Sequence, residues 1–286
     1  MKLLVTGANG QVGSEVVEVA STQGHQVVPL GHGNLTTGGI DLEDHSSIQH
    51  ALSSTRPDVV IHCAAWTNVD ACELNPQRAM AINGDATVAL AAAAQQIGAR
   101  VVYISTDYVF DGTHSEYNEE ATPNPINAYG RSKLAGEQSL NPQDTIVRTS
   151  WVCGQHGNNI VKTVLDMASR SQPMRFVDDQ IGRPTFVEDL APALVHIATQ
   201  DMTGVIHATN STTLSWHQFA KEILTAGGYN LNLLTAIPTS ELTPPRPAPR
   251  PQRSILVGKA LALSKYGPMP PINLSLNSLV HHLMTS

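Results

Sequence analysis

The hydrophobic positions in the first half of the chain form short, nearly continuous runs rather than an alternating pattern. Each run is rich in β-branched residues and is followed by a polar or glycine-containing segment. Parallel strands covered by helices on both faces show this pattern, because neither face of such a strand meets water. The runs predict strands at Lys2–Thr6, Gln26–Leu30, Asp58–His62, Arg100–Ser105 and Thr145–Arg148.

Longer segments with helical spacing of apolar residues separate these runs. The spacing predicts helices at Gln11–Gln23, His45–Ser54, Pro76–Ile97 and Ala128–Leu140. Pro76 stands near the first turn of the third helix, where the missing N–H of proline costs no helical hydrogen bond. Strands and helices that alternate in this way predict an α/β fold, with a Rossmann-type, doubly wound parallel sheet and right-handed crossovers.

The alternation ends near residue 150. Beyond it the sequence predicts helices near Ile160–Arg170, Val187–Ala198 and Ser215–Ala226, separated by short extended pieces. We therefore expect a sheet domain over residues 1–150 and a smaller C-terminal lobe over residues 151–286, part of which can return to the sheet. The segment Thr243–Arg253, TPPRPAPRPQR, fits either a linker or an ordered loop over an anionic ligand, because it spaces arginines between prolines.

Composition narrows the partners of the protein. With 286 residues, of which 41% are hydrophobic, the chain can bury a large core. The formal net charge is -7 and no run of lysine or arginine occurs, so we do not expect nucleic acid as a partner. The N-terminal apolar stretch is too short for a signal peptide or a membrane helix, which predicts a cytoplasmic protein. Neither the cysteines nor the histidines have metal-ligand spacing, so no metal site is predicted.

A glycine-rich turn stands between the first predicted strand and the first predicted helix. The residues Thr6-Gly7-Ala8-Asn9-Gly10-Gln11-Val12-Gly13 have the spacing GxxGxxG. Glycine permits a tight turn and the close approach of a pyrophosphate, and the helix N-terminus supplies N–H groups with partial positive charge. Three glycines alone are weak evidence, but their position predicts a dinucleotide site. Its candidate residues are Gly7, Asn9, Gly10, Gln11 and Val12.

The end of the second predicted strand lacks the acidic residue that usually binds the adenosine ribose. Leu30-Gly31-His32-Gly33 stands there instead. Because a carboxylate would repel a 2′-phosphate, its absence permits NADP as well as NAD. Asp41 and Leu42 fit a turn that would hold the adenine, although Asp41 is equally well explained as a turn former or helix cap.

Tyr129 and Lys133 stand at positions i and i+4 of a predicted helix and therefore share one face. A cation near a phenol favours phenolate, so Lys133, with an oxidised nicotinamide nearby, would lower the pKa of Tyr129 from its ordinary value of about 10. Such a tyrosine can donate a proton during ketone reduction. YxxxK alone is also typical of a solvated helix face. Thr106, however, follows the fourth predicted strand, at the edge where ligands bind in open α/β sheets.

In this order and spacing, TGxxGxxG, a strand-end Ser/Thr and YxxxK resemble the extended short-chain dehydrogenase/reductase family. The resemblance implies that Thr106 hydrogen-bonds the substrate carbonyl and that Tyr129 donates the proton. It implies that Lys133 binds the nicotinamide ribose and tunes Tyr129, so that both contact the cofactor.

The same resemblance implies that the segment Cys63-Ala64-Ala65-Trp66-Thr67 lines the cofactor, with Ala64, Ala65 and Thr67 in contact. Small residues there would allow the ribose and nicotinamide to approach closely. Asn83 fits the family's polar helix position near the active site. From the residues alone it also fits an exposed or capping asparagine.

Longer segments, spread over nearly the whole chain, resemble one branch of this family, the dTDP-4-dehydrorhamnose reductases. They are AAWTNVDACE at 64–73, STDYVFDG at 105–112, NAYGRSKLAGE at 127–137, RTSWV at 148–152, VDDQIGRPT at 177–185, HATNS at 207–211 and APRPQRS at 248–254. The resemblance implies hydride transfer from NADPH or NADH to C4 of dTDP-4-dehydro-L-rhamnose, giving dTDP-L-rhamnose. The 1–150 domain would then bind the dinucleotide and the 151–286 lobe mainly the dTDP-sugar.

By this resemblance Val69, Tyr108 and Trp151 match positions that touch the sugar. Trp151 is equally well explained as an aromatic residue packed beneath the site. Arg250 is a candidate ligand of the diphosphate, because guanidinium pairs bidentately with phosphate.

The sequence departs from the branch in three places. His32 and Gly33 stand where aspartate is common, and Arg246 stands where a small residue is common. The C-terminal tail has no carboxylate cluster of the kind that bridges Mg²⁺ in some dimeric relatives, so metal dependence is not expected and a homodimer stays open. Two other functions fit the same residues. One is a non-catalytic regulatory subunit resembling the methionine adenosyltransferase β subunit, and the other is a reductase or epimerase for another nucleotide sugar.

Overall fold

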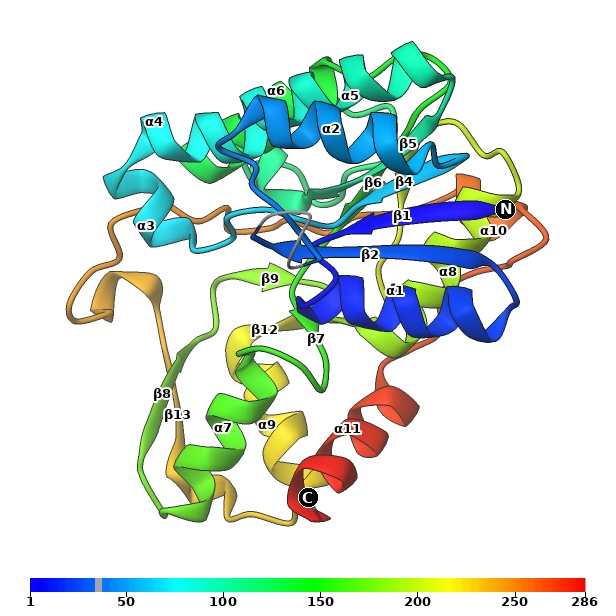
Figure 1. Cartoon of the computed structure of the whole chain (residues 1–286). Coiled ribbons are helices and arrows are strands. Elements are labelled where there is room, and N and C mark those ends of the chain that lie inside the picture. The colour runs from blue at the N-terminus through cyan, green and yellow to red at the C-terminus, as the bar shows by residue number, and fades with distance from the viewer. Residues whose placement is uncertain (34–37, 286) are drawn as a thin grey trace.

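The computed structural model describes residues 1–33 and 38–285, which are built around one seven-stranded sheet (Figure 1). Its strands lie in the order β11-β6-β5-β4-β1-β2-β3, and all neighbouring pairs are parallel. The strands span Lys2–Thr6 (β1), Gln26–His32 (β2), Gly39–Ile40 (β3), Val59–His62 (β4), Arg100–Thr106 (β5), Thr145–Thr149 (β6) and Gly204–His207 (β11). The predicted Rossmann-type parallel sheet is confirmed.

The strand order reverses beside β1. The chain fills one side of the sheet through β2 and β3, and then the other side through β4, β5 and β6. Connections that leave the carboxyl ends of the strands diverge at such a point and leave a crevice between them. The topology therefore collects the segments after β1, β4 and β5 around one crevice.

Helices cover both faces of the sheet. α1 (Gln11–Thr22) packs with α8 (Val187–Thr199) on one face, and α2 (His45–Thr55) packs with α5 (Ala86–Ile97) on the other, beside α6 (Ala128–Gln138) (Figure 1). Leu3 and Val5 belong to the apolar cluster on the α8 side, whereas Leu4 belongs to the cluster on the α5 side. Successive residues of β1 thus enter opposite cores, which explains its continuous hydrophobic run.

The predicted helix over Pro76–Ile97 contains one π-helical stretch. α4 (Pro76–Ala79) and α5 flank Met80–Asp85, which includes Asn83. A short helix that the sequence analysis did not assign, α3 (Val69–Leu74), precedes them and is capped by Asn68, whose side chain accepts a hydrogen bond from Ala71 N. π-helical turns inside helices often mark functional sites.

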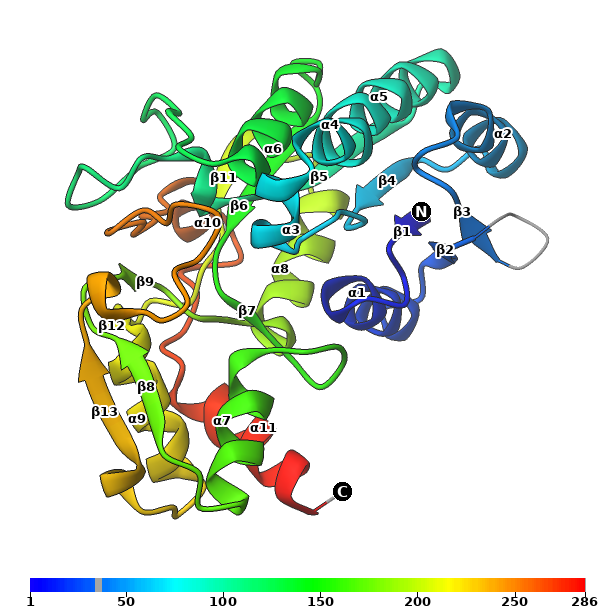
Figure 2. The same ribbon diagram turned by 90° about the vertical axis from the view of Figure 1, so that its left-hand side faces the viewer.

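The C-terminal lobe lies below the sheet in Figures 1 and 2 and has its own apolar core, to which Val161, Phe219 and Leu276 belong. Its helices are α7 (Ile160–Ser169), α9 (Trp216–Ala226) and α11 (Asn273–Thr285), and α10 (Ala260–Leu263) lies near β11. Its strands form the pairs β7 (Val152–Cys153) with β10 (Thr185–Phe186), β8 (Met174–Val177) with β13 (Leu234–Ile237), and β9 (Ile181–Gly182) with β12 (Leu214–Ser215). α8 and β11 follow residue 150 in the chain but pack with the sheet domain. The division into two domains at residue 150 stays a prediction.

Residues 246–257, here called the return segment, connect the lobe with the sheet domain (orange in Figure 2). Ala248 N donates to the carboxylate of Asp70, and Ile181 N donates to Gln252 O. Hydrogen bonds thus attach the proline- and arginine-rich stretch to both parts of the chain, and its position over an anionic ligand stays a prediction.

Candidate active site

One cavity of about 760 Å³ opens at the carboxyl edge of β1, β4 and β5. The sheet domain forms most of its wall, and Trp216 of α9 contributes from the lobe. The residues predicted for cofactor, substrate and catalysis that line it are Gly7, Asn9, Gly10, Gln11, Val12, Asp41, Leu42, Ala64, Ala65, Thr67, Val69, Thr106, Tyr108, Tyr129, Lys133 and Trp151. Arg250 is the one predicted site residue that does not line the cavity.

The glycine-rich turn fits the pyrophosphate of a dinucleotide. Gly7 has a φ of +66°, and a Cβ at this position would lie 2.8 Å from Ala64 N. A Cβ at Gly13 would overlap the Gly7 carbonyl oxygen, so this glycine is required where α1 packs on the turn. Gly10 precedes α1 without a side-chain cap, which leaves the first N–H groups of the helix available to an anion.

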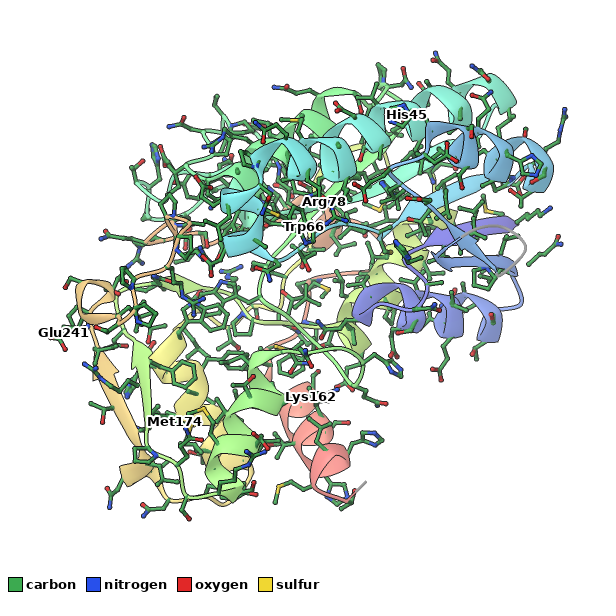
Figure 3. The ribbon with its side chains drawn as sticks, turned by 60° about the vertical axis from the view of Figure 1, so that its left-hand side comes forward. His45, Trp66, Arg78, Lys162, Met174 and Glu241 are labelled. Carbon is green, nitrogen blue, oxygen red and sulfur yellow. The ribbon has the colours of Figure 1, made fainter. Side chains whose placement is uncertain are left out.

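The turn after β3 and α4 also contribute to the cavity wall, through Glu43 and Arg78 among others. Asp41 Oδ1 accepts a hydrogen bond of 2.9 Å from Glu43 N, so the Asp41 carboxylate forms this turn while the residue also lines the cavity. Arg78 pairs with Glu43 at 3.1 Å, and its guanidinium lies 5.3 Å from the ring centroid of Trp66. Arg78 and Trp66 are both labelled in Figure 3. No motif marks Arg78 or Glu43, and sequence reasoning missed both.

Thr106 and Tyr129 meet at the end of β5. Thr106 Oγ1 donates to Asp107 Oδ1 at 3.1 Å and accepts a hydrogen bond of 3.1 Å from Tyr108 N. Burial raises the pKa of Tyr129 well above 10, and the charge of Asp107 raises it further, while a hydrogen bond with Thr106 acts in the opposite direction. Tyr129 is therefore in its protonated form in this structure.

Lys133 lies one turn further along α6 and is buried. Its Nζ is 4.0 Å from the ring centroid of Tyr103. Burial lowers the pKa of Lys133 to about 7, while the charge of Glu137 acts to raise it. We expected Lys133 to lower the pKa of Tyr129, but the groups that act on Tyr129 in this structure raise it on balance. The expectation for the site with an oxidised nicotinamide bound stays a prediction.

Asp107 is a site residue to which the sequence analysis gave no role. It lines the cavity and is only 2% exposed. Its Oδ2 accepts a hydrogen bond from the Ser254 hydroxyl of the return segment. Burial raises the pKa of Asp107 to about 7. Its position directly after Thr106, within STDYVFDG, was the signal available in the sequence.

Asn83 joins α6 to the segment after β4. Its Oδ1 accepts a hydrogen bond of 2.8 Å from Trp66 N, and its Nδ2 donates to Trp66 O and to Ser132 Oγ, both at 3.1 Å. The side chain is 1% exposed, so the interpretation as an exposed or capping residue was wrong. Asn83 thus links Trp66 of the cavity wall to the helix that carries Tyr129 and Lys133.

Aromatic side chains form the lobe side of the cavity. Trp151 stacks on Trp216 with ring centroids 3.6 Å apart, and a Cβ at Gly182 would lie 2.7 Å from the Trp151 ring. Trp151 is thus both a cavity-lining residue and a packed one. Tyr108 meets Tyr129 edge-on at 6.0 Å. Sequence reasoning missed Trp216, because its partner lies far away in the chain.

The side chain of Arg250 is 10% exposed and lies near Tyr108. Its Nη1 donates to Asp70 Oδ1 at 3.0 Å and to Ala248 O at 2.7 Å, and its guanidinium lies 5.9 Å from the ring centroid of Tyr108. Arg246 binds the second oxygen of Asp70 at 3.3 Å. The predicted diphosphate ligand is therefore held by a carboxylate next to the cavity rather than in its wall.

Two further features concern metals and membranes. Within residues 1–33 and 38–285, no group of three or more His, Cys, Asp and Glu side chains is placed to hold a metal ion. Over the same residues, no helix combines the length and apolarity that crossing a bilayer demands.

A Rossmann-type sheet, a glycine-rich turn at a helix N-terminus and a Thr, Tyr and Lys set beside it define an NAD(P)-dependent oxidoreductase of the short-chain dehydrogenase/reductase class. More narrowly, the chain belongs to the family described as RmlD substrate binding domain, which it matches over residues 1–285.

The relatives support this placement over nearly the whole chain. Spore coat polysaccharide biosynthesis protein SpsK of Bacillus subtilis is 38% identical over 91% of this chain and 90% of its own length. A dTDP-4-dehydrorhamnose reductase of Burkholderia thailandensis is 38% identical over 91% of this chain and 92% of its own length. The crystal structure of a dTDP-4-dehydrorhamnose reductase of Bacillus anthracis in complex with NADP has a TM-score of 0.91 and 35% identity, covering 98% of this chain and 99% of that one.

Proposed function

We propose that this chain reduces the C4 ketone of dTDP-4-dehydro-L-rhamnose to the alcohol of dTDP-L-rhamnose with NADPH or NADH. The observation that carries the proposal is that Thr106, Tyr129 and Lys133 line the same cavity as the glycine-rich turn. The names of the relatives indicate the substrate, and the NADP in the Bacillus anthracis structure indicates the cofactor.

The residues of the cavity fit the cofactor. Gly7, Gly10 and the N-terminus of α1 would hold its pyrophosphate, Asp41 and Leu42 its adenine, and Lys133 its nicotinamide ribose. When bound, the dihydronicotinamide would supply the hydride that the carbonyl carbon accepts. Ala64, Ala65 and Thr67 would leave room for its ring.

The remaining chemistry belongs to the side chains. The Thr106 hydroxyl, which donates to Asp107 Oδ1 in this structure, would turn its proton to the ketone oxygen and so polarise the carbonyl. As negative charge develops on that oxygen, Tyr129 would transfer its phenolic proton there, and the ammonium of Lys133 would stabilise the phenolate that remains. Val69, Tyr108 and Trp151 would hold the sugar, and Arg250 would bind the diphosphate when it exchanges Asp70 for phosphate oxygens.

We further propose that the protein acts in the cytoplasm, where nucleotide sugars and reduced nicotinamides occur together, and that it forms a homodimer. Light scattering coupled to size-exclusion chromatography tests the dimer. A mass of one chain at micromolar concentration would contradict it.

The activity is tested with dTDP-4-dehydrorhamnose and each reduced cofactor. The expected result is stoichiometric loss of reduced-nicotinamide absorbance together with dTDP-L-rhamnose as the product, identified by NMR. An epimerase would regenerate its cofactor, so product formation without net cofactor oxidation would contradict the proposal. A regulatory subunit would give neither.

A further inference from the structure

Glu137 lies one helical turn after Lys133 on α6. Glu137 is 5% exposed and Lys133 is 2% exposed. Residues four apart on a helix are neighbours on one face, with Cβ atoms roughly 5–6 Å apart. A buried carboxyl group therefore follows, one turn along the same helix face, the lysine that the proposed function places against the nicotinamide ribose, and its ion pair is with Arg148.

The carboxylate of Glu137 is anchored by the sheet. Arg148 of β6 donates from Nε to Oε1 at 2.9 Å and from Nη2 to Oε2 at 2.6 Å, and Ser105 of β5 donates from Oγ to Oε1 at 2.5 Å. A bidentate guanidinium and a hydroxyl donor both favour the ionised carboxyl. The negative charge is thus fixed in position by two adjacent strands.

We propose that Glu137 is a positioning residue that keeps Lys133 protonated, so that the anchored carboxylate offsets the cost of burying the ammonium in the cofactor site. The inference rests on the proposed function for the use that it assigns to Lys133, but the charge relationship itself does not depend on the substrate. A buried ammonium without such a partner loses its proton more readily.

The surroundings of Lys133 leave Glu137 as the carboxylate that performs this role. Tyr103 of β5 faces the ammonium with its ring, His62 of β4 and Cys63 after it lie within electrostatic range, and Tyr129 shares the helix. Burial lowers the pKa of Lys133 to about 7, and Glu137 is the largest charge acting against this.

The charged groups around Glu137 differ from those around Lys133. Arg148 is its ion-pair partner, and His207 of β11 lies within range of Arg148, with its own pKa lowered to about 4 chiefly by burial. Asp107 raises the pKa of Tyr129 and is not among the charges acting on Lys133.

The direct test is NMR of protein labelled with ¹³Cε-lysine, with the Lys133 resonance assigned by its loss in Lys133→Met. Glu137→Gln is expected to lower the pKa of Lys133 by about one pH unit, a tenfold change in its protonation ratio. Glu137→Asp keeps the charge and is expected to restore most of the shift. An unchanged Lys133 pKa in Glu137→Gln would overturn the inference.

Glu137→Gln leaves Arg148 buried without its partner and can fail to fold for that reason. The double variant Glu137→Gln/Arg148→Met removes both charges and is expected to fold while giving a shift in the same direction. Asp189→Asn is the matched control. The half-buried carboxylate of Asp189 also accepts hydrogen bonds, from Asn210 and Ser275, but it lies in α8. Asp189→Asn is expected to change stability and leave the Lys133 pKa unchanged.

The second readout is NADPH affinity as a function of pH. In the Glu137 variants, the loss of affinity at alkaline pH is expected to begin about one pH unit lower than in the native protein. Equal pH profiles with lowered thermal stability would show a purely structural role and would overturn the inference. Failure of the native protein to reduce the dTDP-sugar would count against the proposed function alone.

Discussion

The Ser254 hydroxyl donates a hydrogen bond to the carboxyl of Asp107, the residue next to Thr106. Both residues are buried, and the bond joins the return segment to the reacting edge of the sheet. Asp107 also raises the pKa of Tyr129, the proposed proton donor. The hydrogen bond from the return segment therefore acts on the pKa of Tyr129 through the carboxyl group of Asp107.

Asp107→Asn is expected to change how stability depends on pH. Burial raises the pKa of Asp107 to about 7, whereas an unfolded aspartate titrates near pH 4. The folded state therefore binds the extra proton between these values, so this group's stabilisation is full below about pH 4 and is lost as the pH rises towards 7, at no more than roughly 1.4 kcal/mol per pH unit. Urea unfolding at about pH 5 and about pH 8 measures it. Equal losses of unfolding free energy between these pH values in the native protein and in Asp107→Asn would contradict this expectation. Ser254→Ala removes a hydrogen bond that lowers the pKa of Asp107, so it should extend the pH range of this stabilisation upwards.

Tyr129→Phe is expected to lower kcat by on the order of 10²-fold or more while NADPH still binds, because the phenol supplies the proton and the ring supplies the packing. Stopped-flow turnover and cofactor titration measure the two effects separately. Tyr108→Phe removes a hydroxyl from the same cavity and should cost much less. Near-native turnover in Tyr129→Phe would remove this residue from the mechanism.

Gly10→Val is expected to abolish dinucleotide binding in a folded protein. A Cβ at Gly10 meets only the Gly7 carbonyl oxygen, at 3.2 Å, so the fold can accept it, while the branched side chain would occupy the pyrophosphate space. Gly13→Val should fail to fold, because its Cβ would overlap Gly7. Calorimetric titration with NADPH, alongside circular dichroism, distinguishes the two, and native affinity in Gly10→Val would show that the turn is merely structural.

The missing acid after β2 predicts that NADPH is accepted at least as well as NADH. Gly31→Asp is a poor probe of this, because a Cβ at Gly31 would overlap the Asn9 side chain. His32 lines the cavity and is exposed, so His32→Asp is expected to weaken NADPH about tenfold relative to NADH by repelling the 2′-phosphate. His32→Asn is the neutral control. A KM ratio that stays the same in His32→Asp would place the 2′-phosphate elsewhere.

Arg250→Met is expected to raise the KM for the dTDP-sugar about tenfold and leave the cofactor KM unchanged, as expected for one lost charge-assisted hydrogen bond. Arg246→Met is the matched control, since Arg246 binds the same Asp70 carboxylate but is more exposed. Steady-state kinetics with both substrates give the answer. Similar effects in the two variants would mean that Arg250 only holds the return segment.

Local patterns were enough to locate most of the sheet domain. β1 was predicted with its observed ends, and the predicted strands and helices around it agree with the structure to within a few residues. Burial on both faces of a strand and the apolar spacing of a helix can each be recognised from consecutive residues. β11 and α11 were not assigned. β11 is a short edge strand whose pairing with β6 depends on residues far away in the chain, and α11 has a weakly segregated apolar face.

The candidate site divides in the same way. The sequence by itself determined the glycine-rich turn, Thr106 at a strand end and the spacing of Tyr129 and Lys133, since each depends on a few neighbouring residues and on the direction of one strand or helix. Only the tertiary structure decided that Arg250 is held by Asp70, that Trp216 supports Trp151, and that Glu137 is anchored by Arg148. These contacts join segments that no local periodicity relates, and the pKa values of Asp107 and Lys133 follow from burial that exists only after those segments have packed together.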